Sequence, residues 1–138
     1  MSSVIVYGSV QGKARPRFRS CGRFVQTYTP KSTMEYETQI KNEYFLQENK
    51  YYKEEPLHIS IRAFFGIPKS WTKKKKDQAV SDLIKPCVKS DLDNIVKVVL
   101  DALNKIAYED DKQICSIYAC KKYSMCPRIE IELKEIDL

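Results

Sequence analysis

The 138-residue chain contains a single histidine, His58, and this restricts the chemistry that it can perform. Nucleophilic triads and most catalytic zinc sites draw on histidine, so an enzyme with this sequence must work through carboxylates and lysines. His58 stands in the alternating stretch "LHISIRAFF". We expect it to point outward from a strand or to pair within the sheet.

Long apolar runs and closely spaced cysteine pairs are also missing from the sequence. No stretch is long and apolar enough to cross a bilayer, and the N-terminus "MSSVIVYGSV" does not resemble a signal peptide. We therefore expect a cytoplasmic protein with no membrane partner. The five cysteines include no CxxC pair, which predicts reduced and mostly buried thiols rather than disulfides or a zinc knuckle.

The composition is that of a basic globular protein. Hydrophobic residues make up 43% of the chain, enough for a core, and the length fits one domain spanning residues 1–138. The net charge is +6 and the sequence pI is about 9.0. This balance favours a polyanionic partner, with nucleic acid ahead of a membrane surface.

Periodicity and turn residues predict a small mixed α/β (α+β) domain. The stretch 11–30 is interpreted as a hairpin or extended loop, and Ser70 as the cap of a short helix. The last two predicted strands flank the turn Ser124–Pro127, so we expect them to form a hairpin. The predicted sheet has about four strands with helices packed on it. The strands are expected over 4–10, 57–67, 113–123 and 128–136, and the helices over about 31–48, 68–80 and 93–104.

Acidic residues gather around one apolar helix in "KSDLDNIVKVVLDALNKIAYEDDKQI", residues 89–114. Asp91 and Asp93 precede or begin the helix, and Lys97 lies one turn beyond Asp93. Asp110 and Asp111 follow the helix, where a return of the chain can bring them near its start. Two carboxylates joined by a third form the oxygen-rich set that Mg²⁺ prefers, and a lysine beside them can stabilise charge on a phosphate.

Each of these residues also has an ordinary structural interpretation. Asp93 can be an N-cap, and Lys97 can be its partner four residues along the helix. Asp101 is expected to form a structural salt bridge or to lie on the surface, and Asp110 with Asp111 can form a simple turn. Taken one at a time, the structural role is the commoner one. Their combination around one helix makes a metal site a competing interpretation that spacing alone does not decide.

The same stretch resembles the signature of RusA-like Holliday junction resolvases. The matching pattern is D-x-D-N, a lysine four residues after the second aspartate, a D-A-L helix end and a D-D-x-Q-I return. "GKARPRF" (12–18), "YTPKST" (28–33) and "PKSWTKKKK" (68–76) are similar to other segments of the family, so the resemblance covers about residues 9–123. Two departures are Ser90, where relatives often have proline, and a turn before Asp110 that is one residue shorter than in some relatives.

The resemblance implies a Mg²⁺-dependent hydrolase, in which Mn²⁺ can substitute, that resolves four-way DNA junctions in recombination and repair as a homodimer. It implies no organic cofactor and a phage or prophage setting. It assigns Asp91, Asp93 and Asp111 as catalytic metal ligands, Asp110 as a supporting ligand and Lys97 as the catalytic lysine. The shortened turn leaves open which of Asp110 and Asp111 is the principal ligand.

Two basic segments are candidates for DNA binding. Arginines alternate in "KARPRFRSCGR" and would share one face of an extended segment, which suits contact with phosphates; the alternative is a solvated hairpin. The run "KKKK" (73–76) is equally consistent with DNA contact and with a solvated helix face. Phosphate contacts predict a steep salt dependence. The candidate DNA-binding residues are Lys13, Arg15, Arg17, Arg19, Lys73, Lys74 and Lys89.

Two rival functions stay open from the sequence. One is a nuclease of the same fold that acts on other branched or flapped DNA. The other is a non-catalytic, basic DNA-binding protein of the same fold. The intact set of acids argues against the second rival, because carboxylates facing DNA phosphates would weaken simple binding.

Overall fold

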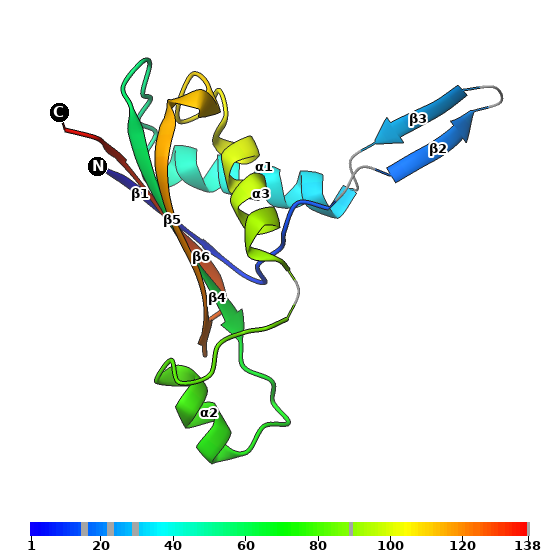
Figure 1. Ribbon diagram of the computed structural model, residues 1–138, viewed down its shortest axis with the longest axis vertical. Coiled ribbons are helices and arrows are strands. Elements are labelled where there is room, and N and C mark those ends of the chain that lie inside the picture. The colour runs from blue at the N-terminus through cyan, green and yellow to red at the C-terminus, as the bar shows by residue number, and fades with distance from the viewer. Residues whose placement is uncertain (15–16, 22–23, 29–30, 89, 138) are drawn as a thin grey trace.

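A computed structural model describes residues 1–14, 31–88 and 90–137 in full, and residues 17–21 and 24–28 by their backbone. The described chain forms an α+β fold in which helices pack on a four-stranded mixed sheet (Figure 1). In chain order, the elements are β1 (Ser2–Tyr7), β2 (Arg17–Cys21), β3 (Phe24–Tyr28), α1 (Lys31–Gln47), β4 (Leu57–Gly66), α2 (Lys73–Val80), α3 (Leu92–Leu103), the 3₁₀ turn η1 (Asp111–Gln113), β5 (Ile114–Ser124) and β6 (Arg128–Glu135).

The strand order of the sheet is β1-β6-β4-β5. β6 runs antiparallel to both β1 and β4, and β5 runs parallel to β4. The predicted hairpin of the last two strands is therefore wrong, because β4 lies between them. A parallel pair needs a long crossover connection, and α2 and α3 lie in the one that joins β4 to β5.

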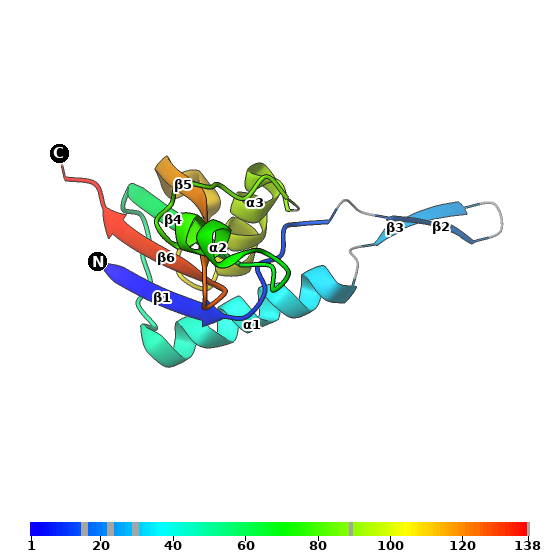
Figure 2. The same ribbon diagram turned by 90° about the horizontal axis from the view of Figure 1, so that it is seen from below.

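β4 shows how the sequence builds the core. Its residues alternate strictly between buried and half-buried, with Leu57, Ile59 and Ile61 fully buried on one face. Each such aliphatic side chain contributes about 1.5–3 kcal/mol when it is removed from water. α1 and α3 cover this face of the sheet (Figure 2).

α3 is the most apolar helix of the fold, as its sequence predicts. Five of its twelve residues are buried, and they recur at spacings of three and four. The sequence predicts an apolar stripe on α1 formed by Tyr36, Ile40, Tyr44 and Phe45. The first three are buried, whereas Phe45 is 51% exposed. The buried residues of α3 are Ile95, Val98, Val99, Ala102 and Leu103.

α2 begins later than predicted. Its N-cap is Thr72, whose hydroxyl accepts a hydrogen bond from the backbone N–H of Lys75 at 3.3 Å, so Ser70 is not the cap. Both side chains can cap a helix. Trp71, between them, packs edge-on against Tyr123 with ring centroids 5.2 Å apart. α2 lies at the end of the sheet, away from α1 (Figure 1).

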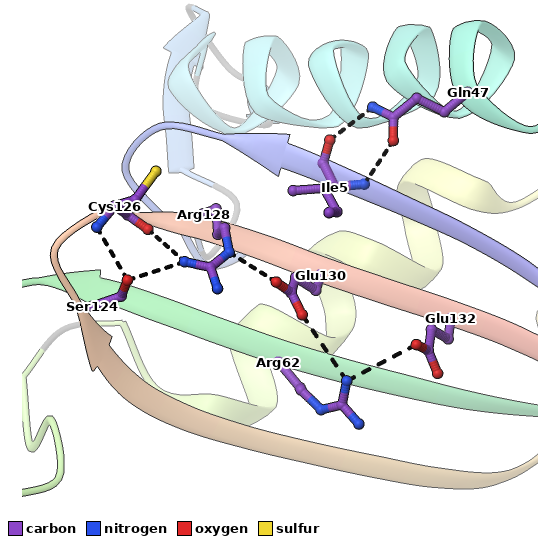
Figure 3. Close-up of polar contacts among 8 residues, drawn as sticks. All are labelled: Ile5, Gln47, Arg62, Ser124, Cys126, Arg128, Glu130 and Glu132. Carbon is purple, nitrogen blue, oxygen red and sulfur yellow. Dashed lines mark hydrogen bonds and ion pairs between the residues drawn. The ribbon is translucent and has the colours of Figure 1, made fainter. Parts of the chain in front are cut away.

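The other face of the sheet is open and charged. His58 hydrogen-bonds Ser116 Oγ at 2.7 Å and Ser60 Oγ at 3.2 Å, which confirms its predicted outward position in the sheet. Farther along the same face, Arg62 lies between Glu130 and Glu132, and Arg128 pairs with Glu130 at 2.8 Å (Figure 3). The two pairs of Arg62 are cross-strand and support the register of β4 against β6, whereas the pair of Arg128 with Glu130 lies within β6.

The β2–β3 hairpin extends away from the sheet and its helices (Figures 1 and 2). Of the two interpretations of residues 11–30, a hairpin or an extended loop, the pairing of β2 with β3 agrees with the hairpin. The side chains of Arg15, Arg17 and Arg19 lie outside the described residues, as does Lys89. Within the described ranges, no helix has the length and apolar character that crossing a bilayer requires.

Four cysteines are free thiols, as the sequence predicts: Cys87, Cys115, Cys120 and Cys126. The prediction that they are mostly buried is wrong. Three of them are exposed, and Cys120 is half-buried. Three of the four lie in β5 or the turn that follows it, and β5 is an edge strand with much of its surface open to solvent.

Candidate metal centre at α3 and the acidic turn

The N-terminus of α3 presents two carboxylates. Asp91 is the N-cap residue, in an extended conformation, and Asp93 lies in the first turn. The structural interpretation of Asp93 as the N-cap is therefore wrong. The Asp91 side chain makes no capping bond to the helix, so its oxygens remain available to a ligand. Both carboxylates are exposed at the helix end where the macrodipole favours negative charge.

Lys97 is exposed one turn farther along α3. Among the described residues, Lys97 and Asp93 do not lie within ion-pair distance of one another, although their spacing permits a pair. The ordinary structural role that spacing allowed for Lys97 is thus not realised, and its side chain is exposed to solvent.

A tight return of the chain connects α3 to the acidic turn, which we define as residues 109–111. Asn104 ends the helix, and Lys105 adopts a left-handed conformation with φ of 67°. Tyr108 is fully buried beneath the turn, and its hydroxyl donates to the carbonyl of Leu100 at 2.7 Å. Burial, followed by the charges of Asp111, Asp101 and Asp110, raises the pKa of Tyr108.

The side chains of Asp110 and Asp111 are in contact, and their pKa values are shifted in opposite directions. The backbone N–H of Lys112 donates to Asp110 Oδ1 at 2.9 Å, and this bond lowers the pKa of Asp110. Desolvation raises the pKa of Asp111, and the neighbouring carboxylates of Asp110 and Asp101 raise it further. Adjacent carboxylates of this kind resist full ionisation unless a cation lies between them.

Asp101 forms the structural salt bridge that the sequence predicts. Its partner is Lys13, whose Nζ lies 3.1 Å from Asp101 and 2.6 Å from Glu37 on α1. Lys13 was a candidate for DNA binding. Its side chain is only 24% exposed and lies between two acids.

The segment that contains Lys13 is fixed against the start of α3. Gly12 N donates to Ser90 Oγ at 2.9 Å, and Lys13 N donates to the carbonyl of Asn94 at 2.8 Å. A Cβ atom on Gly12 would lie 2.7 Å from Ser90 Cβ and 2.9 Å from Asn94 Cβ, so the approach requires glycine. Ser90, where relatives often have proline, thus supplies a hydrogen bond that links the root of the hairpin to α3.

Gln113 is a buried residue of this region whose role the sequence analysis did not predict. It belongs to a capping box with Asp110, in which the side chain of each residue bonds the backbone of the other end of the turn. The D-x-x-Q spacing is a signal for this box, although here the box caps only a short 3₁₀ turn.

The donor set suits a hard divalent cation. Carboxylate oxygens are the ligands that Mg²⁺ prefers. Desolvation and then the neighbouring carboxylates raise the pKa of Asp111, and a cation would offset the charge of these carboxylates. The structure brings Asp101, Asp110 and Asp111 near one another. Among the described residues, no three acidic, histidine or cysteine side chains already surround one point, so the ligand roles of Asp91, Asp93 and Asp111 stay predictions.

The remaining described candidates for DNA contact lie on α2. Lys73 and Lys74 are exposed there, whereas Lys75 lies over the ring of Trp71 with its Nζ 4.1 Å from the ring centroid. The lysine run is therefore partly structural. Lys73 and Lys74 point to solvent and keep their predicted role as candidates.

Comparison with known proteins identifies the family. The family model described as "Endodeoxyribonuclease RusA" matches residues 8–134, which is most of the chain. This chain belongs to the RusA endodeoxyribonuclease family. It is also 40% identical over 83 residues to "Uncharacterized protein YqaN" of Bacillus subtilis (strain 168), a match that covers 59% of this chain and 58% of the relative's length. The expected family resemblance is thereby confirmed.

Proposed function

We propose that this protein is a divalent-metal-dependent endonuclease that hydrolyses phosphodiester bonds at four-way DNA junctions in recombination and repair. Family membership across residues 8–134 supports the nuclease class. The observation that carries the metal dependence is the contact of Asp110 with Asp111, where desolvation and then the neighbouring carboxylates raise the pKa of Asp111. A nuclease must bring a negatively charged phosphate to these acids, and a cation makes that approach favourable.

Asp91, Asp93 and Asp111 are proposed to hold Mg²⁺, or Mn²⁺ in its place, with Asp110 as a supporting ligand. The bound cation would lower the pKa of a water molecule and offset phosphate charge. Lys97, exposed one turn into α3, would stabilise the charge that develops on the phosphate. The oxygens of Asp91 are not used in capping α3, which suits a ligand role.

The DNA contacts are proposed to lie on the β2–β3 hairpin and α2. The hairpin carries Arg17 and Arg19 on β2, and alternate positions of a strand share one face. Exposed Lys73 and Lys74 add a second basic surface. Contacts to phosphates fix the protein on the duplex without reading sequence, which is suited to a structure-selective enzyme.

A homodimer would fit a junction, because a four-way junction has approximate two-fold symmetry and resolution needs a cut on each of two strands. A dimer with C₂ symmetry presents two equivalent centres related in the same way. Sedimentation of the protein with and without a synthetic junction would test this arrangement.

Cleavage of a synthetic four-way junction tests the proposed function. The wild type is expected to nick the junction symmetrically in Mg²⁺, and Asp93→Asn is expected to bind the junction with unchanged affinity but not cut it. Asp137→Asn removes an exposed carboxylate beyond β6 and serves as the matched control, which should cut normally. Normal cleavage by Asp93→Asn would reject the proposed site.

A panel of flaps, forks and linear duplexes separates the rival functions. Preference for a flap or fork over the junction would indicate a nuclease of the same fold that acts on other branched DNA. Junction binding without nicking, at every Mg²⁺ and Mn²⁺ concentration, would indicate a non-catalytic DNA-binding protein.

A further inference from the structure

The side chain of Gln113 bonds to the backbone of the acidic turn. Its Oε1 accepts hydrogen bonds from the N–H groups of Glu109 at 2.9 Å and Asp110 at 3.1 Å. Gln113 is 8% exposed, so these bonds are shielded from competition with water. The two amides immediately before the Asp111 carboxylate are thus held by one buried oxygen.

The other end of the same side chain bonds to a different segment of the chain. Nε2 of Gln113 donates to the carbonyls of Tyr52 at 3.3 Å and Glu55 at 3.1 Å, in the loop that leads into β4. Two backbone bonds run alongside, from Tyr52 N to the carbonyl of Ala107 at 2.8 Å and from Glu109 N to the carbonyl of Tyr52 at 3.2 Å. The amide of Gln113 therefore bridges the acidic turn to the loop 52–55.

A glutamine amide is well matched to this place. It offers two donors and one acceptor oxygen with two lone pairs, and all four capacities are used here. A buried polar group costs about 1–3 kcal/mol when it is left without a partner, so the complete set favours this single arrangement. A shorter or apolar side chain would leave the amide of Asp110 and the carbonyl of Glu55 without this partner, whereas Glu109 N and Tyr52 O would keep only the bond to each other.

We infer that Gln113 is a positioning residue for the metal-binding carboxylates, setting where Asp110 and Asp111 stand relative to the start of α3. This inference rests on the proposed function. Metal ligands must be placed to within a few tenths of an ångström, and the acidic turn is otherwise an exposed loop. The buried amide of Gln113 holds the backbone of the acidic turn in place, while the side chain of Asp111 is exposed to solvent.

Substitution of Gln113 is therefore expected to act on metal binding and turnover rather than on DNA binding. Loss of residues that support metal ligands costs about 10–100-fold in metal affinity or activity. The Mg²⁺ concentration for half-maximal cleavage should rise about tenfold or more, and kcat should fall by a similar factor. The KM for the junction should not change, since the proposed DNA contacts lie on β2, β3 and α2.

Two variants and a matched control test the inference. Gln113→Met removes all four bonds, and Gln113→Glu keeps the size and the acceptor side but presents a carboxylate to the carbonyls of Tyr52 and Glu55. Gln47→Met is the control, because Gln47 also clamps a backbone through both ends of its amide: Oε1 accepts from Ile5 N at 2.9 Å and Nε2 donates to Ile5 O at 2.8 Å (Figure 3). Gln47 holds the edge of β1, away from the acidic turn.

The measurements are junction cleavage against Mg²⁺ concentration, and Mn²⁺ binding to the DNA-free protein by electron paramagnetic resonance. Both Gln113 variants are expected to need more metal in each measurement, at a temperature where circular dichroism shows them folded, and Gln47→Met is expected to match the wild type. A folded Gln113→Met or Gln113→Glu with wild-type metal dependence would overturn the inference. If Gln113→Met does not fold, Gln113→Glu decides the matter.

The outcomes for the two proposals are separable. A wild type that binds Mn²⁺ but cuts no branched DNA would reject the proposed function, and the Mn²⁺ affinities of the variants would still decide the role of Gln113. A wild type that cuts normally, with variants that do likewise at the same metal concentrations, would reject the positioning role alone.

Discussion

Lys13 and Asp101 meet through a 3.1 Å contact that joins the root of the basic hairpin to helix α3. Lys13 also lies 2.6 Å from Glu37, so one ammonium group separates two carboxylates from different helices. Burial lowers the pKa of Lys13, but the bonds to Glu37 and Asp101 outweigh it and raise the pKa overall. Lys13 therefore stabilises the fold by pairing with both acids.

Lys13→Met is expected to lower the free energy of unfolding by about 1–2 kcal/mol, because two charge-assisted hydrogen bonds are lost and the two acids are left facing one another. Lys31→Met is the control, since the pair of Lys31 with Glu35 spans 3.8 Å at the surface and should contribute little. Urea denaturation at pH 7 measures both. Because the pKa of Lys13 is raised, its stabilisation is present at neutral pH and is lost as the pH rises through the raised pKa. Equal effects of the two variants would contradict this role.

Asp111→Asn is expected to stabilise the metal-free protein slightly at neutral pH. The folded state raises the pKa of Asp111, so its ionisation opposes folding once the pH exceeds the pKa of the unfolded chain. The gain should be small because Asp111 is exposed, and it should vanish in acid, where the carboxyl is protonated in both states. Thermal unfolding in EDTA from pH 3 to pH 7 measures it. A loss of stability at neutral pH would contradict the argument.

Asp110→Ala should have the opposite effect. Its carboxylate accepts a hydrogen bond from Lys112 N and caps η1, so its removal should lower the stability of the fold. The folded state lowers the pKa of Asp110, so this stabilisation exists above the ordinary carboxyl pKa and fades as the pH falls through the lowered value. The same unfolding series provides the measurement, and Asp110→Asn, which can still cap, serves as the control. Loss of equal size in both variants would show that capping is not the cause.

Gly12→Ala is expected to destabilise the protein by about 1–3 kcal/mol, because the added methyl group overlaps Ser90 and Asn94. Ser90→Ala provides the comparison, since it removes the hydrogen bond from Gly12 N but leaves the spacing intact, and should cost less. Chemical denaturation measures the free energy of unfolding of both variants. A tolerated Gly12→Ala would mean that the hairpin root can move away from α3 without loss.

Tyr108→Phe should cost about 0.5–1.5 kcal/mol, since the hydrogen bond from the Tyr108 hydroxyl to the carbonyl of Leu100 is lost while that carbonyl keeps its bond from Asn104 N. Tyr123→Phe is the matched control: Tyr123 is also buried, but its hydroxyl has no hydrogen-bond partner among the described residues. Differential scanning calorimetry of the two variants provides the measurement. An equal effect of both would indicate that packing of the ring, not the bond to Leu100, dominates.

Local sequence patterns predicted the elements of this fold but not how the strands pair. Alternation in β4 and the three-and-four spacing of α3 depend only on nearby residues, so both could be predicted from the sequence. The partner of β5 is decided instead by the crossover through α2 and α3, which places β5 beside β4 rather than beside β6. Neighbours in sequence are the usual partners in a sheet, and here that expectation failed.

The candidate site, too, could be predicted only in part from the sequence. Spacing and family resemblance selected the acids on either side of α3, and the structure brings Asp101 into electrostatic contact with Asp111. The positions of Lys13 and Gln113 were not predictable from spacing. Lysine and glutamine are usually exposed, so the burial of Gln113 and the dual pairing of Lys13 follow from distant segments that meet only in the folded chain.

β6 follows the other described strands in the sequence, yet it lies in the sheet between β1, the first of them, and β4. A growing chain therefore exposes β1 and β4 before the strand that joins them exists. We expect the sheet beneath α1 and α3 to be complete only when residues 128–135 have left the ribosome and can pair. Until then, the nascent polypeptide would carry the acids of the centre without the complete sheet that supports α3.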